Sequence, residues 1–335
     1  MILTELMGHN LTRAEVGAAM AALLDTGVAD DVKAEFLAAL ARKGETAAEI
    51  AAFALELRAR AVDPQIDPAR IGGVLLDVVG TGADMAHTFN ISSCTMFVAA
   101  AAGVAVAKHG NRAITSKCGS ADVLAALGAK IELPPAAARR CLEAAGVTFF
   151  FAPLYHPAFK IIAPVRRQLA ERKQRTVFNI LGPLVNPCRP THQVVGVFDC
   201  ALVPRYAEVL RLLGVQRAFV VHGDGLDEFT TLGTNTVAEV RDGEVFSSQF
   251  SVVSGRLADL AGDDPVTNAT IARAVLAGKD RGPKRDIVVL NAAAALVVTG
   301  KAHDFDAGRA LAAELIDSGA ALARLERFVA ATNQA

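Results

Sequence analysis

The sequence lacks the marks of a secreted, disulfide-bonded or zinc-clustered protein. It contains no tryptophan, two tyrosines and only 5% aromatic residues over its 335 positions. Its five cysteines are odd in number, scattered, and never spaced as C-x-x-C, which argues against a disulfide framework or a zinc site. This cysteine usage is typical of a reducing compartment, so we expect a cytoplasmic protein.

Long apolar runs and a charge excess are also missing. The longest strongly apolar run, Met96 to Ala107, is far shorter than the ~20 residues of a membrane helix. The N-terminus lacks the basic-then-apolar pattern of a signal peptide. Lys and Arg total 34 against 35 for Asp and Glu, giving a formal net charge of −1. We therefore expect neither nucleic acid nor a membrane among the partners.

The chain is long enough for two domains, and its pattern changes near residue 65. Residues 1–65 show helical periodicity, with capping boxes predicted at Thr12–Glu15 and Thr46–Glu49. The segment 63–68 is rich in Pro and Asp and predicts a linker. We expect residues 1–65 to form a small all-helical domain and residues 70–335 to form a larger α/β domain.

Apolar strands alternate with helical segments after the linker, which predicts an α/β fold with a mostly parallel central sheet flanked by helices. A hairpin is predicted around Asp242-Gly243, with arms at 236–240 and 244–246. An apolar helix is predicted at 287–298. The predicted parallel strands are Leu75–Val79, Val104–Ala107, Val147–Phe151, Gln193–Phe198 and Arg217–His222.

One segment, about 164–185, fits neither domain by pattern. It begins with a basic stretch, PVRRQLAERKQR, which predicts a helix over 164–175. We expect this segment to return to the N-terminal helices and to join the two domains through its Pro and Gly hinges.

Two polar turns, close together in sequence, predict an anion site. The strand ending at Val79 runs into Gly80 and Gly82, and these are followed by Asp84. A second turn at 88–93 then opens a long Ala/Val helix. Glycines let the backbone approach a phosphate, and a helix N-terminus offers unpaired N–H groups. The pattern favours a phosphorylated small molecule as the ligand.

Two further segments also have features of an anion-binding site. The run Lys108-His109-Gly110-Asn111-Arg112 follows a strand directly, at the carboxyl edge where ligands bind in open α/β sheets. The segment 116–122 places hydroxyls and a lysine before another helix. The alternatives are a solvated basic loop for the first segment and plain helix capping by Ser120 for the second.

Asp227 and Glu228 lie with Asp224 on a glycine-rich loop after the strand that ends at His222. Carboxylates beside a bound pyrophosphate suit Mg²⁺, which prefers oxygen ligands. The alternative is an acidic surface turn.

Three other side chains are candidates for contacts with substrate. Arg166 could pair with a substrate carboxylate through its planar guanidinium, although its basic neighbours make surface charge an alternative. His109 and His156 could orient a substrate or move a proton, and the alternative for each is a structural histidine.

Together these motifs resemble the anthranilate phosphoribosyltransferases, in a two-domain family that includes nucleoside phosphorylases. The resemblance covers nearly the whole chain in order, and its segments are GTGAD (80–84), TFNISS (88–93), VAKHGNRAITSKCGSADVLAALG (106–128), FFFAPLYHPAFKIIAPVRRQL (149–169), RTVFNILGPLVNP (175–187), HGDGLDEFT (222–230) and DIVVLNAAAAL (286–296). The family usually has Gly, Thr, Ser and Met where this chain has Ala83, Ser93, Cys118 and Phe159.

The resemblance implies transfer of the 5-phosphoribosyl group from phosphoribosyl pyrophosphate to the amine of anthranilate, the second step of tryptophan synthesis from chorismate. It also implies a Mg²⁺ cofactor and a homodimer formed through the helical domain. A flexible loop over the donor is expected at 108–116.

The residues assigned on this basis fall into three overlapping sets. Catalytic roles are assigned to Lys108, His109 and Arg166. Metal ligation is assigned to Ser92, Asp227 and Glu228. Substrate binding is assigned to Gly80, Gly82, Ala83, Asp84, Thr88, Asn90, Ile91, Ser92, Ser93, Lys108, Gly110, Asn111, Arg112, Ser116, Ser120 and Arg166, of which Gly80, Asn111 and Arg166 are expected to contact anthranilate.

Two alternative functions remain at this stage. A nucleoside phosphorylase would use phosphate as the nucleophile, and Asp227-Glu228 favours a metal–pyrophosphate donor over that reaction. A non-catalytic protein could bind nucleic acid through the basic helix, but the near-zero net charge argues against it.

Overall fold

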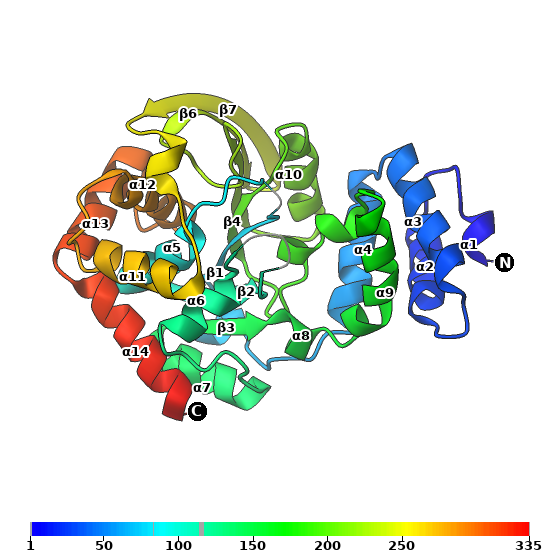
Figure 1. The fold of residues 1–335 in the computed structure, drawn as a ribbon, viewed down its shortest axis with the longest axis horizontal. Helices are drawn as coiled ribbons and strands as arrows, with labels where there is room; N and C mark the ends of the chain where they lie inside the picture. The colour runs from blue at the N-terminus through cyan, green and yellow to red at the C-terminus, as the bar shows by residue number, and fades with distance from the viewer. Residues whose placement is uncertain (1, 83, 114–116, 335) are drawn as a thin grey trace.

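The computed structural model describes residues 2–82, 84–113 and 117–334, and these form a small helical body beside a larger α/β body (Figure 1). The predicted site residues Ala83 and Ser116 lie outside the described residues. The helical body contains α1 (Ile2–Glu5), α2 (Arg13–Leu24), α3 (Asp30–Lys43) and α4 (Ala47–Ala59). The residue limits predicted for the two domains stay predictions.

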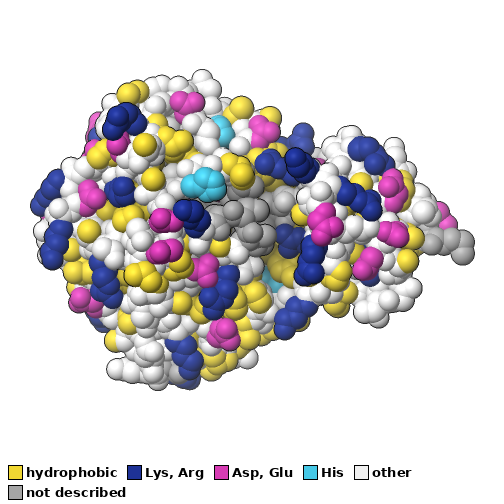
Figure 2. Space-filling model, in the orientation of Figure 1, with side chains coloured by type: hydrophobic (Ala, Val, Ile, Leu, Met, Phe, Trp, Pro, Cys, Tyr) yellow, Lys and Arg dark blue, Asp and Glu magenta, His cyan; other side chains and the backbone are white. Residues whose placement is uncertain are grey.

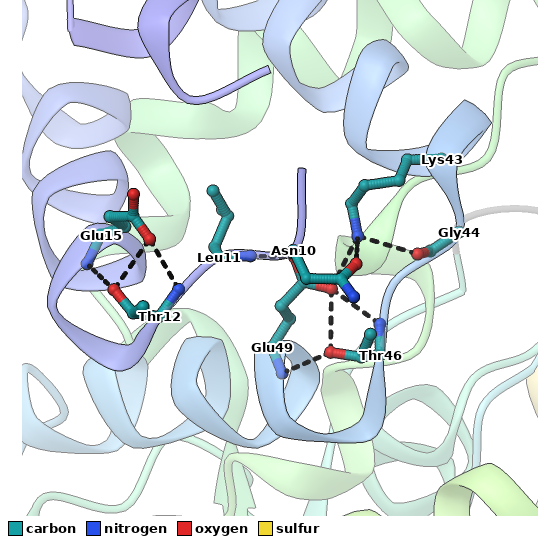
Figure 3. A network of polar contacts seen from close by, with 8 residues as sticks. All are labelled: Asn10, Leu11, Thr12, Glu15, Lys43, Gly44, Thr46 and Glu49. Carbon is teal, nitrogen blue, oxygen red and sulfur yellow. Dashed lines mark hydrogen bonds and ion pairs between the residues drawn. The ribbon is translucent and has the colours of Figure 1, made fainter. Parts of the chain in front are cut away.

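Both predicted capping boxes are confirmed (Figure 3). Thr12 caps α2 together with Glu15, at the surface. Thr46 caps α4 together with Glu49, whose fully buried carboxylate also accepts hydrogen bonds from the Leu11 N–H (2.8 Å) and Lys43 Nζ (2.8 Å). The second box therefore ties three segments of the helical body together.

The basic helix α9 (Ala158–Glu171) packs against α2 and α3 of the helical body. The predicted bounds, 164–175, were wrong at both ends, and Pro164 lies inside the helix. The physical reason is the apolar stripe formed by Ala158, Ile162, Val165 and Leu169, which continues through the proline and is buried.

Seven strands of the described chain form one sheet in the order β3-β2-β1-β4-β5-β6-β7. The first five in the chain are parallel, and β6 and β7 form an antiparallel hairpin at one edge. The sequence expectation of a mostly parallel sheet is confirmed. The strands are β1 (Leu75–Gly80), β2 (Ala105–Gly110), β3 (Val147–Phe151), β4 (His192–Gly196), β5 (Arg217–Gly223), β6 (Leu232–Arg241) and β7 (Glu244–Val253).

Helices cover both faces of the sheet (Figure 1). One core lies under α5 (Ile91–Ala101) and α12 (Pro283–Val298), and the other lies under α10 (Leu202–Leu212) and continues into the helical body. The predicted apolar helix is confirmed but starts earlier, at Pro283. The remaining elements are α6 (Ser120–Ala126), α7 (Pro135–Ala145), α8 (Ala152–Tyr155), α11 (Pro265–Leu276), α13 (Phe305–Asp317), α14 (Ala320–Gln334) and four 3-10 turns at Pro68–Ile71, Val177–Asn179, Gly182–Leu184 and Leu257–Leu260. Within the part of the chain that the structure describes, every helix is too short or too polar for a bilayer span.

Candidate functional site at the carboxyl edge of the sheet

The first glycine turn meets the acidic loop, as the sequence pattern predicts. The Gly82 N–H donates a 2.6 Å hydrogen bond to Oδ2 of Asp227, and the Asp227 N–H lies 3.4 Å from Oδ2 of Asp84. Gly80 at the end of β1 pairs in register with Gly196 at the end of β4. A Cβ at either glycine would collide with Asp227, so both positions require the absence of a side chain. The two loops are thereby held together at one edge of the sheet.

Lys108 lies in β2 beneath this edge rather than in a flexible loop. Its side chain is 2% exposed, and Nζ donates to the Val78 carbonyl and to Oγ of Ser92 (3.1 Å). The expectation of a loop from 108 was wrong for Lys108, His109 and Gly110, because β2 continues to Gly110 through its pairing with β3. Lys108 is a fixed, buried cation below the loops.

The electrostatics of the site are those of crowded carboxylates around one cation. Burial raises the pKa of Asp227 well above its usual value, and the charges of Asp84 and Glu228 raise it further. Burial also raises the pKa of Glu228 to about 7, although Lys108 opposes that rise. Burial lowers the pKa of Lys108, while Asp77, Glu228 and Asp227 act to raise it.

The carboxylates of Asp84, Asp227 and Glu228 form a site that suits a divalent cation. Over residues 2–82, 84–113 and 117–334, no three His, Cys, Asp or Glu side chains form a ready-made metal cluster. The mutual repulsion of Asp84, Asp227 and Glu228 is nevertheless a negative field that a bound cation relieves. Carboxylates that share their site with a phosphate ligand are the donor set that Mg²⁺ uses.

The turn at 88–93 is fixed by contacts with Cys118 and with the segment 261–268. The Asn90 amide donates to the Cys118 carbonyl (3.2 Å) and accepts from Nδ2 of Asn268 (3.0 Å). Thr88 forms an isolated β-bridge with Ala261. Asn268 is buried, and sequence reasoning missed it because nothing in its local pattern marks it.

Two predicted residues of this turn are buried. Ile91 is 1% exposed and belongs to the hydrophobic core, so its side chain faces away from solvent. The hydroxyl of Ser93 is buried and has no hydrogen-bond partner among the described residues. Any contact of these two residues with a ligand would therefore rest largely on the backbone.

Asp122 holds residues 112, 113 and 119 together, and sequence reasoning gave it no role. Its carboxylate accepts from Nη1 of Arg112 (3.0 Å) and from the N–H groups of Ala113 (2.8 Å) and Gly119 (3.0 Å). Burial acts to raise the pKa of Asp122, but these donors outweigh it and lower the pKa. Gly119, not Ser120, is the N-cap of α6, so the capping alternative for Ser120 was wrong.

Arg112 and Ser120 are engaged within this segment. The guanidinium of Arg112 is paired with Asp122, and the Ser120 hydroxyl lies 3.4 Å from the Asn111 carbonyl oxygen. Asn111 itself is exposed beside them.

The rings of His109, His156, Phe159 and Phe178 form a file of rings that runs from the sheet edge toward the helical body. The rings of His109 and His156 lie 5.1 Å apart, and His156 lies 5.2 Å from the ring of Phe159. The Arg166 guanidinium lies 5.8 Å from the centroids of Phe159 and Phe178. The file connects Arg166, on α9, with the end of β2.

Both histidines in this file are neutral. Burial lowers the pKa of His109 to about 3, and the same cause lowers that of His156 to about 4. Nδ1 of His109 lies 3.2 Å from the Gly182 carbonyl oxygen. A neutral imidazole in this position can orient a substrate, and it does not carry a positive charge at pH 7.

The space-filling view shows a hollow between the two bodies, with Lys and Arg side chains on its rim (Figure 2). The arrangement suits a ligand with anionic groups.

Comparison with known proteins agrees with this geometry. A family model described as "Glycosyl transferase family, a/b domain" matches residues 72–322, and one described as "Glycosyl transferase family, helical bundle domain" matches residues 3–61. A protein of Roseiflexus castenholzii named anthranilate phosphoribosyltransferase is 49% identical, over 96% of this chain and 94% of the relative. The chain belongs to the anthranilate phosphoribosyltransferase family.

Solved structures of this family share the fold. Anthranilate phosphoribosyltransferase from Thermus thermophilus superposes with a TM-score of 0.89 at 41% identity, covering 99% of this chain and 98% of that one. The enzyme from Saccharomyces cerevisiae in complex with PRPP and Mg superposes with a TM-score of 0.85 at 28% identity, covering 97% and 94% of the two chains. The predicted fold class is therefore confirmed.

Proposed function

We propose that this chain catalyses the reaction of its family, transfer of the 5-phosphoribosyl group from phosphoribosyl pyrophosphate to the amine of anthranilate with release of pyrophosphate. The observation that carries the proposal is the hydrogen bond between Gly82 and Asp227, which brings a glycine turn for phosphate and a carboxylate loop for a metal to one place. Full-length similarity to enzymes of that name supports the same reaction.

The donor would lie over the glycine turn and the N-terminus of α5. The helix α5 begins at Ile91, directly after the turn at 88–90, and the positive end of its dipole favours pyrophosphate there. Lys108 adds a cation below the turn, in a position too buried for a flexible contact.

Mg²⁺ is the proposed cofactor, held by Asp227 and Glu228 with the hydroxyl of Ser92 nearby. When bound, it neutralises charge on the pyrophosphate. The yeast relative was solved with PRPP and Mg, which supports this choice. Lys108 Nζ contacts Ser92, and the charge of Lys108 opposes the rise in the pKa of Glu228 that burial causes.

The acceptor would lie along the file of rings. The Arg166 guanidinium is proposed to bind the anthranilate carboxylate, while Asn111 and the neutral His109 orient the aromatic amine. The amine attacks the anomeric carbon as pyrophosphate leaves, so catalysis rests on stabilising the leaving charge and on positioning. Well-oriented groups supply roughly 7–11 kcal/mol of such a barrier.

We further propose that the chain works in the cytoplasm as a homodimer that associates through the helical body. The five free cysteines support a reducing compartment. Light scattering on the purified protein tests the dimer: a mass of one chain across micromolar concentrations would contradict it.

One assay tests the function. Protein, Mg²⁺, phosphoribosyl pyrophosphate and anthranilate are mixed, and the loss of anthranilate fluorescence is followed. We expect a loss that requires all four components. A second mixture of nucleoside and inorganic phosphate without Mg²⁺ tests the nucleoside phosphorylase alternative. Turnover in the second mixture and none in the first would overturn the proposal.

A further inference from the structure

A cavity of about 450 Å³ lies away from the proposed active site, between the helical body and the α/β body. Arg13, Glu56 and Arg58 line it from α2 and α4. The α/β side is formed by residues 189–191, which precede β4, and by 213–214, which precede β5. The cavity therefore opens at the amino edge of the sheet, opposite the edge that carries the glycine turn.

Arg58 is a buried cation without a counter-ion. It is 8% exposed, and its Nε donates a 2.6 Å hydrogen bond to the Leu184 carbonyl. Its Nη2 has no hydrogen-bond partner, and no carboxylate among the residues that the structure describes pairs with it. Burial lowers the pKa of Arg58 to about 10, and the charge of Arg189 contributes. An uncompensated buried charge is costly, and an anion relieves that cost.

Two more guanidinium groups line the same cavity. Arg13 stands at the first residue of α2, and Arg189 precedes β4 with a left-handed φ of 50°. Neither forms an ion pair with a described residue. Glu56 is the one carboxylate among the lining residues, and it is already paired with Arg60. The cavity thus carries three arginines that no carboxylate of the described chain neutralises.

We propose that this cavity binds a small oxyanion, carried by a carboxylate or a phosphate, which bridges Arg58 and Arg13 of the helical body to Arg189 of the α/β body. Guanidinium groups bind both kinds of oxyanion through paired N–H donors. Because the three arginines come from both bodies, an occupied cavity holds the bodies together, and the site is a place for an effector distinct from the substrates.

The test is calorimetric titration of the full-length protein with inorganic phosphate and, separately, with citrate, at constant ionic strength. The proposed active site also binds phosphate, so a comparison of variants isolates the cavity. Arg189→Gln is the main variant because this side chain is exposed and its loss leaves the core intact. Arg140→Gln, an exposed arginine on α7 outside the cavity, is the matched control.

We expect saturable binding in the wild type and in Arg140→Gln that weakens at least tenfold in Arg189→Gln. A cavity response to citrate alone supports the proposal with a carboxylate as the bound group, and a response to phosphate alone supports it with a phosphate. Equal affinities in the wild type and Arg189→Gln for both anions would overturn the proposal. Arg58→Met provides a second variant, which should lose the same binding event. Because binding is the readout, the result does not depend on the transferase activity.

Discussion

The Asp227 carboxylate accepts a 2.6 Å hydrogen bond from the Gly82 N–H, across 145 residues of chain. This bond fixes the distance between a turn that suits phosphate and a loop that suits a metal. It also places Asp227 within the field of Asp84 and Glu228, at a position where burial already disfavours its charge. The site is therefore assembled at an electrostatic cost in the free protein, and its ligands relieve that cost.

Asp227→Asn should lower the activity without lowering the thermal stability. The amide keeps an oxygen for Gly82 but removes one of three crowded charges, so we expect an equal or higher Tm at pH 7. Activity should fall about 100-fold or more, because a metal ligand and its charge are lost. Asp224→Asn, on the exposed part of the same loop, is the control. Thermal unfolding and kcat/KM as a function of Mg²⁺ are measured, and unchanged kinetics for Asp227→Asn would contradict its assignment.

Gly80→Ala should be far more harmful than Gly17→Ala. A Cβ at Gly80 collides with the Asp227 carboxylate, so the turn or the loop must move. A Cβ at Gly17, within α2, meets Glu56 at an ordinary 3.6 Å. We expect Gly17→Ala to stabilise the protein by about 0.5–1 kcal/mol, because alanine favours helix. Gly80→Ala should raise the KM for phosphoribosyl pyrophosphate at least tenfold; unchanged kinetics would show that the turn is not used.

Arg166→Gln tests the acceptor subsite. The guanidinium lies by the rings of Phe159 and Phe178 and is proposed to hold the anthranilate carboxylate. Loss of one charge-assisted pair should raise the KM for anthranilate about tenfold to a hundredfold and leave that for phosphoribosyl pyrophosphate nearly unchanged. Arg167→Gln, its exposed neighbour, is the control. A larger effect on the donor than on anthranilate would place Arg166 in the donor site instead.

The contribution of His109 and His156 to stability should decline in mild acid, while the raised pKa values of Asp227 and Glu228 act in the opposite direction. Each has a pKa lowered by burial, to about 3 and about 4, so the unfolded chain binds more protons than the folded chain below about pH 6.5. The part of the free energy of unfolding that the two histidines contribute is fully present above pH 6.5 and falls as the pH drops toward 4. The two groups together contribute a slope of about 3 kcal/mol per pH unit. Urea unfolding of wild type and His156→Gln between pH 7 and 5 measures it, and the variant should lose about half of this part of the slope.

The two capping boxes should differ in strength although their sequences are alike. Thr12→Ala removes an exposed cap, and we expect a loss of about 0.5–1 kcal/mol in the free energy of unfolding. Thr46→Ala also disturbs the buried Glu49, which binds Lys43 and the Leu11 N–H, so the loss should reach about 2 kcal/mol. Denaturant unfolding of both variants gives the comparison; equal losses would mean that the burial of Glu49 adds nothing.

The sequence was most informative where the determining interactions are local. The caps at Thr12 and Thr46 depend on residues three apart, and the strands of the sheet follow from short apolar runs. The boundary of α9 was wrong because a proline was given more weight than the buried stripe around it. Lys108 was assigned to a flexible loop from the family resemblance, whereas its ammonium group donates to the Val78 carbonyl inside the sheet.

The sequence by itself determined the α/β plan, the glycine turn, and the acidic loop with Asp227 and Glu228, because turn chemistry and strand periodicity are properties of neighbouring residues. Only the tertiary structure decided that Lys108 is buried beneath the site, that Asp122 gathers three donors, and that Arg58 lacks a counter-ion among the described residues. Burial and long-range pairing set the charge and the partners of these side chains. Both depend on segments that are distant in the chain and become neighbours only when the protein folds.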